Sequence, residues 1–370
     1  MKNQLQKSEG AYMKKRRQEL SAMNVMLCIF VVMIHILSYP IGVFSPGTDS
    51  HSVLRHDAVL IPSQLISFAV QGFVLLSGLK LFLDGRDDIK YLRYLKKRFF
   101  SVVLPYLICF TVYYIYFIIV YAYPVNNAGF ILKHFFCGSL VYHLYFIPLI
   151  VQFDLLLPLW RKIVHGISPI LVIPAAIFAG AFFEIYLPSL IEVFTDKPLA
   201  IMNDRIFTTY IGFWLTGCYI GKYYDEFAEL CRKNFGIITS VFSASAAILA
   251  LFSHFAYNWI CAVPALNNIK YFYCISAILF FLALYLMLPE DSLGKIPIVK
   301  LIDRHSYGIY LIHVLLLIVT DRFVIEKYAV QNQLLAFILR FVAAYAGTVI
   351  VLCIVSFAKK LLAAPFKRRS

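Results

Sequence analysis

The sequence is poor in charged residues: Asp, Glu, Lys and Arg make up 15% of its 370 residues, and only 20 residues are acidic. Soluble globular domains carry about 25% charged residues, so the composition excludes a soluble fold of this size. Disordered chains, collagen and coiled coils need many charged residues or a Gly–Pro repeat. The 17 Gly and 15 Pro residues supply no such repeat, and these classes are excluded as well.

Short motifs of soluble catalysis and metal binding are also missing. The chain has no P-loop, no GxGxxG and no GxSxG nucleophile elbow. Its eight cysteines form no C-x-x-C pair, and most lie inside apolar runs, which argues against a zinc site and a disulfide framework. The cysteines are therefore expected to be small buried hydrophobes, and no metal is expected.

Hydrophobic residues, by contrast, make up 61% of the chain and gather in long runs between short polar segments. A helix that crosses a bilayer needs about 17–25 mostly apolar residues. The runs predict an all-α polytopic membrane protein, a bundle of about ten transmembrane helices, of which the sixth is short enough to be re-entrant. The predicted spans are Leu20–Val43, Ile61–Phe82, Phe99–Tyr123, Leu140–Trp160, Gly166–Leu187, Ile206–Gly221, Phe235–Phe255, Tyr271–Leu288, His305–Thr320 and Leu334–Ser356.

Lys and Arg are distributed unevenly between alternate loops. With the N-terminus on the cytoplasmic side, the cytoplasmic segments hold 25 of the 34 Lys and Arg residues and the external loops hold 7. Because basic loops face the cytoplasm, both termini are predicted to be cytoplasmic. The predicted organisation is a basic N-terminal segment over residues 1–19, a membrane domain over 20–356 and a basic tail over 357–370.

Ionisable side chains inside a span are costly, so they mark functional sites or structural pairs. His35 lies about 22 Å from the start of its predicted helix, in the outer half of the membrane. His143 opens the fourth span from outside and His313 lies near the midplane, so the three histidines are predicted to mark a polar path. A packing role for His143 stays open, as do structural pairs for Asp154 and Arg340.

A basic strip joins the second and third spans on the predicted cytoplasmic side. Its members are Lys90, Arg93, Lys96, Lys97 and Arg98. Arg and Lys donors suit the phosphates of a nucleotide or coenzyme A, while positive-inside anchoring explains the strip without a ligand. The net charge of +14 is spread over such short clusters between apolar runs, which favours membrane anchoring over nucleic-acid binding.

Six further patterns occur in a fixed order along the chain. They are Val-Val-Met-Ile-His ending at His35, Gln-Gly-Phe-Val-Leu-Leu-Ser-Gly over Gln71–Gly78, Lys-Lys-Arg-Phe-Phe-Ser-Val-Val-Leu-Pro-Tyr over Lys96–Tyr106, His-Leu-Tyr-Phe-Ile-Pro over His143–Pro148, the glycine-spaced segment Gly212–Gly221, and Ser-Tyr-Gly-Ile-Tyr-Leu-Ile-His over Ser306–His313. In this order they resemble the acyltransferase-3 family of bacterial integral-membrane O-acyltransferases. The family is expected to have about ten spans with both termini inside, as the charge count predicts.

The resemblance implies an enzyme of the bacterial cytoplasmic membrane. It would move an acyl group from cytoplasmic acyl-CoA to a hydroxyl of a cell-surface glycan or its lipid-linked precursor. Acetyl is the expected acyl group, and succinyl is the other option. His35 would be the general base or a transient acyl carrier, because imidazole titrates near neutrality. The donor-binding and acyl-path residues would be Lys97, Arg98, Arg93, His143, Tyr145 and His313. Acyl-CoA, the saccharide acceptor and membrane lipids are the implied partners, without a metal or nucleic acid.

Two positions depart from the family pattern. Asn24 stands where the family has Arg or Lys, eleven residues before its histidine, and Ser101 stands where it has a second Arg. Both positions are expected to help hold the acyl donor. A catalytically lapsed membrane sensor therefore stays an alternative. A polysaccharide or lipid-linked sugar exporter is another, because ten spans, aromatic-rich walls and scattered polar residues would serve it too.

Overall fold

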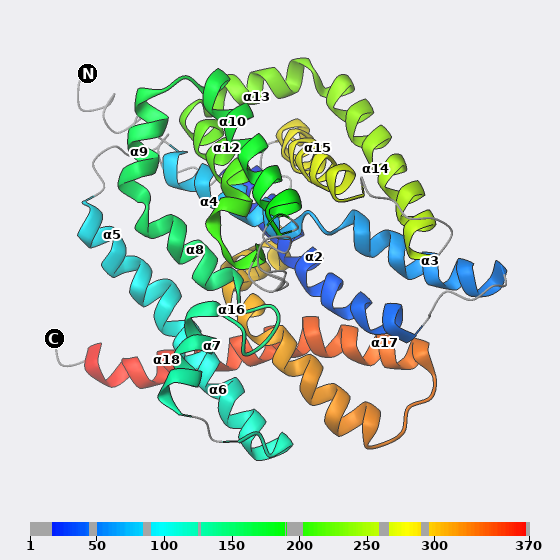
Figure 1. Cartoon of the computed structure of the whole chain (residues 1–370). Coiled ribbons are helices and arrows are strands. Elements are labelled where there is room, and N and C mark those ends of the chain that lie inside the picture. The colour runs from blue at the N-terminus through cyan, green and yellow to red at the C-terminus, as the bar shows by residue number, and fades with distance from the viewer. Residues whose placement is uncertain are drawn as a thin grey trace.

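The structure, a computed structural model, describes residues 17–43, 50–83, 90–124, 127–188, 190, 203–258, 266–289 and 296–367. Within these ranges the regular structure is helical and contains no strand. Eight helices are long and apolar enough to cross a bilayer, which confirms an all-α polytopic membrane protein (Figure 1). Several of these eight are built from consecutive helical segments that run on without a loop.

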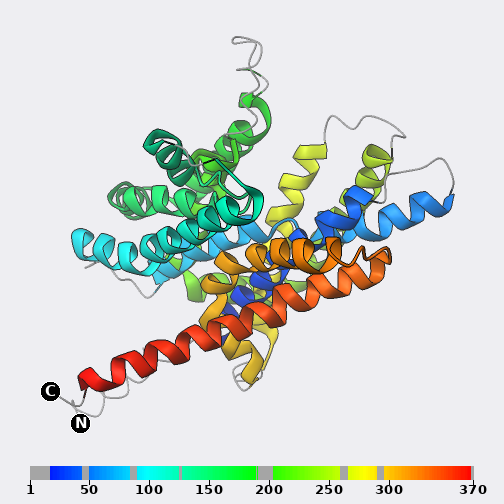
Figure 2. The same ribbon diagram turned by 90° about the horizontal axis from the view of Figure 1, so that it is seen from below.

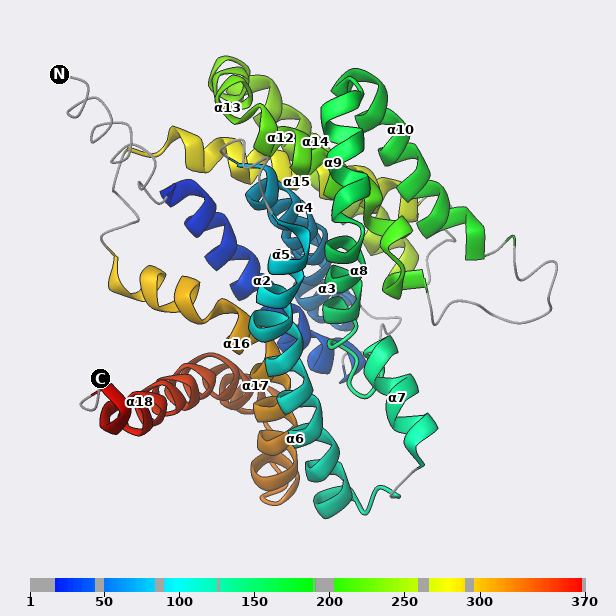
Figure 3. The ribbon, with the colours of Figure 1, turned by 90° about the vertical axis from the view of Figure 1, so that its left-hand side faces the viewer.

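The long helices correspond to eight of the ten predicted spans. They are α2 (Gln18–Val43), α3 (Ser50–Leu65) with α4 (Ala69–Phe82), α5 (Tyr91–Arg98) with η2 (Phe99–Val103) and α6 (Leu104–Tyr121), α10 (Pro169–Ala181) with η3 (Phe182–Tyr186), α14 (Phe235–Tyr257), α15 (Leu266–Met287), α16 (Pro297–Thr320) with η6 (Asp321–Glu326), and α17 (Gln333–Val342) with η7 (Ala343–Gly347) and α18 (Thr348–Lys367). Figure 3 shows α5 and α6 as one long helix, and Figure 2 shows the same for α17 and α18.

The predicted fourth and sixth spans are not single long helices. The fourth consists of a non-helical segment over residues 138–145, then α8 (Phe146–Leu155) and α9 (Leu157–Gly166). The two helices separate at Leu156, where Pro158 follows in the first turn of α9 and removes a backbone N–H donor. The sixth is a 3₁₀ turn followed by α12 (Ile211–Lys222), which has only 12 residues. Two short helices, α7 (Ala128–Cys137) and α13 (Tyr224–Lys233), complete the elements that matter here.

The centre of the bundle is a close contact between α4 and α12, in which glycines replace side chains. A Cβ atom at Gly217 would lie 2.0 Å from the carbonyl oxygen of Leu75, and one at Gly221 would lie 2.3 Å from that of Leu79. Small residues four apart on one helix let two backbones approach closely inside a membrane. The glycines of the segment 212–221 are therefore explained by packing.

The outer helices expose their apolar side chains, as a lipid-facing surface requires. In the most apolar window of α2, 61% of residues are buried inside the protein, against 11% for α14. Exposed residues of α14 include Ile237, Val241 and Ile248. Without water at this surface, such side chains face lipid tails, so α2 is a core helix and α14 a peripheral one.

Contacts between helix ends show which ends share a side of the bundle. The Gln18 side-chain amide donates to the carbonyl of Pro289 (2.8 Å), and the Tyr224 hydroxyl donates to the Glu19 carboxylate (2.6 Å). The start of α2, the end of α15 and the start of α13 therefore lie together. This side is named the inner side below, following the orientation that the charge count predicts, and the opposite side is the outer side.

Candidate active site

Three histidines from distant parts of the chain lie together near the middle of the bundle. The ring centroids of His35 (α2) and His313 (α16) are 5.2 Å apart, as are those of His143 and His313, and those of His35 and His143 are 6.1 Å apart. We call these residues the histidine cluster. The predicted polar path is thus a single site, in which His313 lies level with His35. Each of these two histidines lies about 25 Å from the start of its helix. His313 lies this far along α16 because the helix begins at Pro297, eight residues before the predicted start at His305.

His143 reaches the cluster on the non-helical segment 138–145. α7 ends at Gly138, whose φ of 60° reverses the chain, and a Cβ atom there would lie 2.4 Å from the Cα of Tyr145. Only glycine adopts this conformation in so little space. The Tyr310 hydroxyl donates a hydrogen bond to the backbone carbonyl of His143. The turn and this hydrogen bond together fix the position of the His143 ring.

Aromatic rings surround the three imidazoles. Tyr142 lies 4.9 Å from His35, centroid to centroid, and Tyr310 and Tyr113 lie 5.4 and 5.8 Å from His143. His143 and His313 are 2% and 0% exposed, whereas Tyr142 is 49% exposed. The cluster is therefore enclosed by apolar and aromatic groups except on the side of Tyr142. Such an enclosure keeps water from the imidazoles while leaving one approach to His35.

The buried imidazoles keep nitrogen atoms that have no partner in the described part of the chain. His313 Nδ1 lies 2.9 Å from the carbonyl oxygen of Ile309, which only accepts, so Nδ1 carries the proton and Nε2 is the free acceptor. Among the residues that the structure describes, neither this Nε2 nor either ring nitrogen of His143 has a hydrogen-bond partner. Leaving buried polar atoms unpaired costs about 1–3 kcal/mol each. These nitrogens are therefore the natural contacts for a polar reactant.

The histidine cluster does not have the geometry of a metal site. Among the residues that the structure describes, no three His, Cys, Asp or Glu side chains converge as metal ligands. The imidazoles of His35 and His313 are stacked, and those of His143 and His313 are edge-on. The arrangement suits proton transfer and hydrogen bonding to a reactant.

Arg98 is the member of the basic strip that pairs with a buried side chain of the bundle. Arg98 Nε donates to Asp154 Oδ2 (2.6 Å), and the Tyr94 hydroxyl donates to the other oxygen of the same carboxylate. The Asp154 side chain is only 4% exposed, and that of Arg98 is 31% exposed. The terminal guanidinium nitrogens of Arg98 make no hydrogen bond within the described chain. Asp154 thus fixes the guanidinium, and its two terminal nitrogens remain open to an anionic ligand.

The other predicted donor residues lie on the surface of the same helix. Arg93 and Lys97 are exposed on α5, without the buried partner that Arg98 has. Tyr113 follows Arg98 by 15 residues on one continuous helix and lies beside His143, so Arg98 lies about 22 Å on the inner side of the cluster. Lys97 and Arg98 therefore lie at the inner end of the helix whose middle lines the site.

Tyr145, the remaining predicted site residue, is placed differently. It ends the segment 138–145, and its ring makes no ring contact with the three histidines but lies 5.9 Å from the guanidinium of Arg205. The aromatic contacts of the cluster come instead from Tyr142, Tyr113 and Tyr310. Tyr310 lies in the segment Ser306–His313 that the sequence singles out, three residues before His313, so a helical turn already places both on neighbouring positions.

The two departures from the family pattern have different surroundings. The Asn24 amide donates to Asp303 Oδ1 (2.8 Å) and Ser306 Oγ (3.0 Å), which ties α2 to α16 on the inner side of the histidines. Ser101 is exposed within η2 and makes no comparable link. Asn24 therefore serves a structural contact between the two helices that carry His35 and His313.

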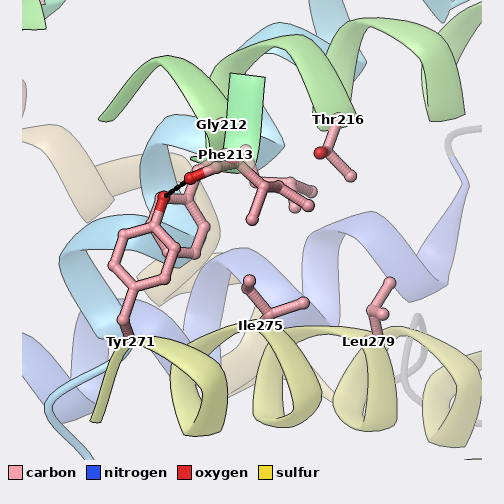
Figure 4. Close-up of a pocket in the computed structure, with 8 residues that line it drawn as sticks. Gly212, Phe213, Thr216, Tyr271, Ile275 and Leu279 are labelled. Atoms are coloured by element: carbon pink, nitrogen blue, oxygen red, sulfur yellow. Dashed lines mark hydrogen bonds between the residues drawn. The ribbon is translucent and has the colours of Figure 1, made fainter. Parts of the chain in front are cut away.

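A small pocket lies elsewhere, between α4, α10, α12 and α15. Figure 4 shows Tyr271, Ile275 and Leu279 rising from α15 toward Gly212 and Phe213 of α12. Its volume of about 10 Å³ is no more than one water molecule needs. No member of the histidine cluster lines it, so this pocket is separate from the cluster.

Comparison with known proteins gives one match. A family model described as an acyltransferase domain matches residues 17–357, nearly the whole chain. No curated protein and no solved structure matches the chain. The matched range begins at the start of α2, ends within α18, and contains the histidine cluster and the Arg98–Asp154 pair.

Proposed function

Because this chain belongs to the acyltransferase-3 family and is a membrane acyltransferase, we propose that it transfers an acyl group from cytoplasmic acyl-CoA to a hydroxyl of a saccharide acceptor. The acyl group is acetyl, and the acceptor is a cell-surface glycan or its lipid-linked precursor, met in the bacterial cytoplasmic membrane. The observation that carries this proposal is the gathering of His35, His143 and His313 into one enclosed site.

His35 is the general base of the proposed reaction. The acceptor hydroxyl gives its proton to the His35 imidazole while its oxygen attacks the carbonyl carbon of the thioester. The carbon–sulfur bond then breaks, and CoA leaves as the thiol after taking that proton from His35. His313 Nε2, the free acceptor beside His35, and the unpaired nitrogens of His143 hold the reacting groups in place.

The inner part of the site is suited to the donor. The open nitrogens of Arg98, held by Asp154, bind a CoA phosphate, and Arg93 and Lys97 add positive charge at the same end of α5. The pantetheine arm of CoA then extends along the helix toward the histidines, over the length that separates Arg98 from Tyr113. Donor and acceptor thus approach His35 from opposite sides.

The test is thiol release from acetyl-CoA and succinyl-CoA by the purified protein in lipid nanodiscs, with cell-envelope glycan added. We expect glycan-dependent release with acetyl-CoA that falls at least ~100-fold in His35→Ala, as loss of a general base requires. His165→Ala, which removes an exposed histidine at the end of α9, is the matched control and should keep the wild-type rate.

Two results would contradict this assignment. Release that is unchanged in His35→Ala would place the base on another residue. A wild-type protein that releases no thiol from either donor, while vesicles containing it take up lipid-linked saccharide, would favour an exporter.

A further inference from the structure

Four side chains form a second polar group on the outer side of the histidine cluster. They are Tyr39 of α2, Tyr142 of the segment 138–145, Asp321 of η6 and Arg340 of α17, and we call them the outer polar site. Tyr39 follows His35 by four residues, so it lies on the same face of α2 about 6 Å further out. Tyr142 contacts His35 directly, with ring centroids 4.9 Å apart. The outer polar site therefore adjoins the one open side of the cluster.

Three members of this site, Tyr39, Asp321 and Arg340, contact one another. Arg340 Nε donates to Asp321 Oδ1 (2.8 Å), and the Arg340 guanidinium lies over the ring of Tyr39 at 4.1 Å from its centroid. The side chains of Arg340 and Asp321 are 13% and 15% exposed. The site thus combines a fixed planar cation, a fixed carboxylate and two phenol rings.

Its hydrogen-bonding capacity is only partly used. A guanidinium has five N–H donors, and within the described chain Arg340 uses one of them. Tyr142 is 49% exposed, and its hydroxyl makes no hydrogen bond within the same residues. A purely structural ion pair with so little exposure would be expected to satisfy more of its donors. The remaining donors therefore point to a ligand.

We propose that the outer polar site binds the acceptor as a neutral, hydroxyl-rich ring, an inference that rests on the proposed function. One face of the ring lies on Tyr142, and its hydroxyls bond to the terminal nitrogens of Arg340 and to the Asp321 carboxylate. A neighbouring hydroxyl of the same ring then lies against His35. The Arg340–Asp321 pair carries no net charge, so it favours an uncharged polyol over an anionic or cationic group.

The experiment measures binding of cell-envelope glycan fragments to the protein in nanodiscs without any acyl donor, and then transfer from acetyl-CoA. We expect Tyr142→Ala and Asp321→Asn each to raise the Kd for the fragments and the KM for the acceptor at least ~10-fold. The KM for acetyl-CoA should stay within about twofold of wild type. Arg322→Ala removes the neighbouring exposed Arg322–Glu326 pair and is the control, with both acceptor constants unchanged.

A charge exchange separates recognition from structure. The double variant Asp321→Arg, Arg340→Asp restores an ion pair between the same two helices but moves both ligand groups. We expect its acceptor Kd to stay raised, and a return to the wild-type Kd would overturn the proposal. If the exchange prevents folding, Tyr142→Ala decides, because this exposed ring can be removed without a buried cavity: an unchanged Kd overturns the proposal.

The outcomes also separate this inference from the proposed function. Glycan binding that depends on Tyr142, without any thiol release, supports the acceptor site and contradicts the transferase. Thiol release together with an acceptor Kd and KM that are unchanged in both Tyr142→Ala and Asp321→Asn supports the transferase and overturns the acceptor site. Absence of glycan binding by the wild type also overturns the acceptor site.

Discussion

At the scale of single residues, the buried Asp154 and the partly buried Asp321 determine where two arginines can act. Asp154 uses one carboxylate oxygen for Arg98 and the other for Tyr94, and Asp321 holds Arg340 through its Nε atom. In both pairs the terminal guanidinium nitrogens remain without a partner in the described chain. An arginine held at Nε presents its other donors in one plane, which suits phosphate on the inner side and hydroxyls on the outer side.

Asp154→Asn should weaken donor binding without removing the chemistry. The neutral amide holds the Arg98 guanidinium less firmly, so its terminal nitrogens lose their fixed direction toward the CoA phosphate. We expect the KM for acetyl-CoA to rise about 10-fold, equivalent to about 1.4 kcal/mol, with little change in the acceptor KM. The measurement is thiol release at varied acetyl-CoA concentration.

Asp225→Asn is the control for that prediction. Asp225 pairs with Arg17 at 3.4 Å on the same inner side, but its side chain is 90% exposed, and surface pairs contribute little. It should leave the KM for acetyl-CoA unchanged. An unchanged KM in Asp154→Asn would mean that Asp154 only stabilises the bundle.

The candidate residues were largely visible in the sequence, but their grouping was not. His35, His143 and His313 stand out as ionisable groups in apolar segments. Their contact depends on the turn at Gly138, which brings His143 into the bundle, and on the extra turns at the start of α16. The pairing of Arg98 with Asp154, 56 residues apart, follows from helix packing that no local pattern specifies.

At the scale of helices, hydropathy identified each span that is one continuous helix. It failed for the fourth span, because an apolar run scores alike whether or not its backbone is helical. Gly138 and Pro158 interrupt that run, and the gap between them is filled by a turn and the short helix α8. The short α12 is accommodated because α4 packs closely along its glycine face.

The contact between α4 and α12 should tolerate no added methyl group. Gly217→Ala places a Cβ atom 2.0 Å from the Leu75 carbonyl oxygen, so the two helices must move apart. We expect a loss of about 1–3 kcal/mol in stability, measured as a lower unfolding temperature in detergent. Gly236→Ala is the matched control: no atom lies within 4 Å of its Cβ position, and Ala favours a helix, so stability should stay equal or rise.

At the scale of the whole molecule, the orientation in the membrane is a prediction that an epitope inserted into loops can check. A tag after Ala329, in the outer turn between η6 and α17, should be accessible to antibody on spheroplasts. A tag after Asn234, between α13 and α14, should become accessible only after permeabilisation. The opposite pattern would reverse the sides on which donor and acceptor enter.

The placement of the site gives the molecule two faces with different polar groups. Arg98 and the exposed basic residues of α5 lie toward the inner side, and Tyr39, Asp321 and Arg340 lie toward the outer side, with the histidines between them. In the proposed reaction, only the acyl group moves from one side to the other. The helices themselves need not rock as they would in a transporter.

The histidine cluster also has a consequence for biosynthesis. Its members are drawn from positions 35, 143 and 313, so the ribosome must complete α16 before the site can assemble. Nascent chains, and fragments left by premature termination, carry His35 in the membrane without the partners that enclose it. The complete site therefore exists only after more than four-fifths of the chain has been translated.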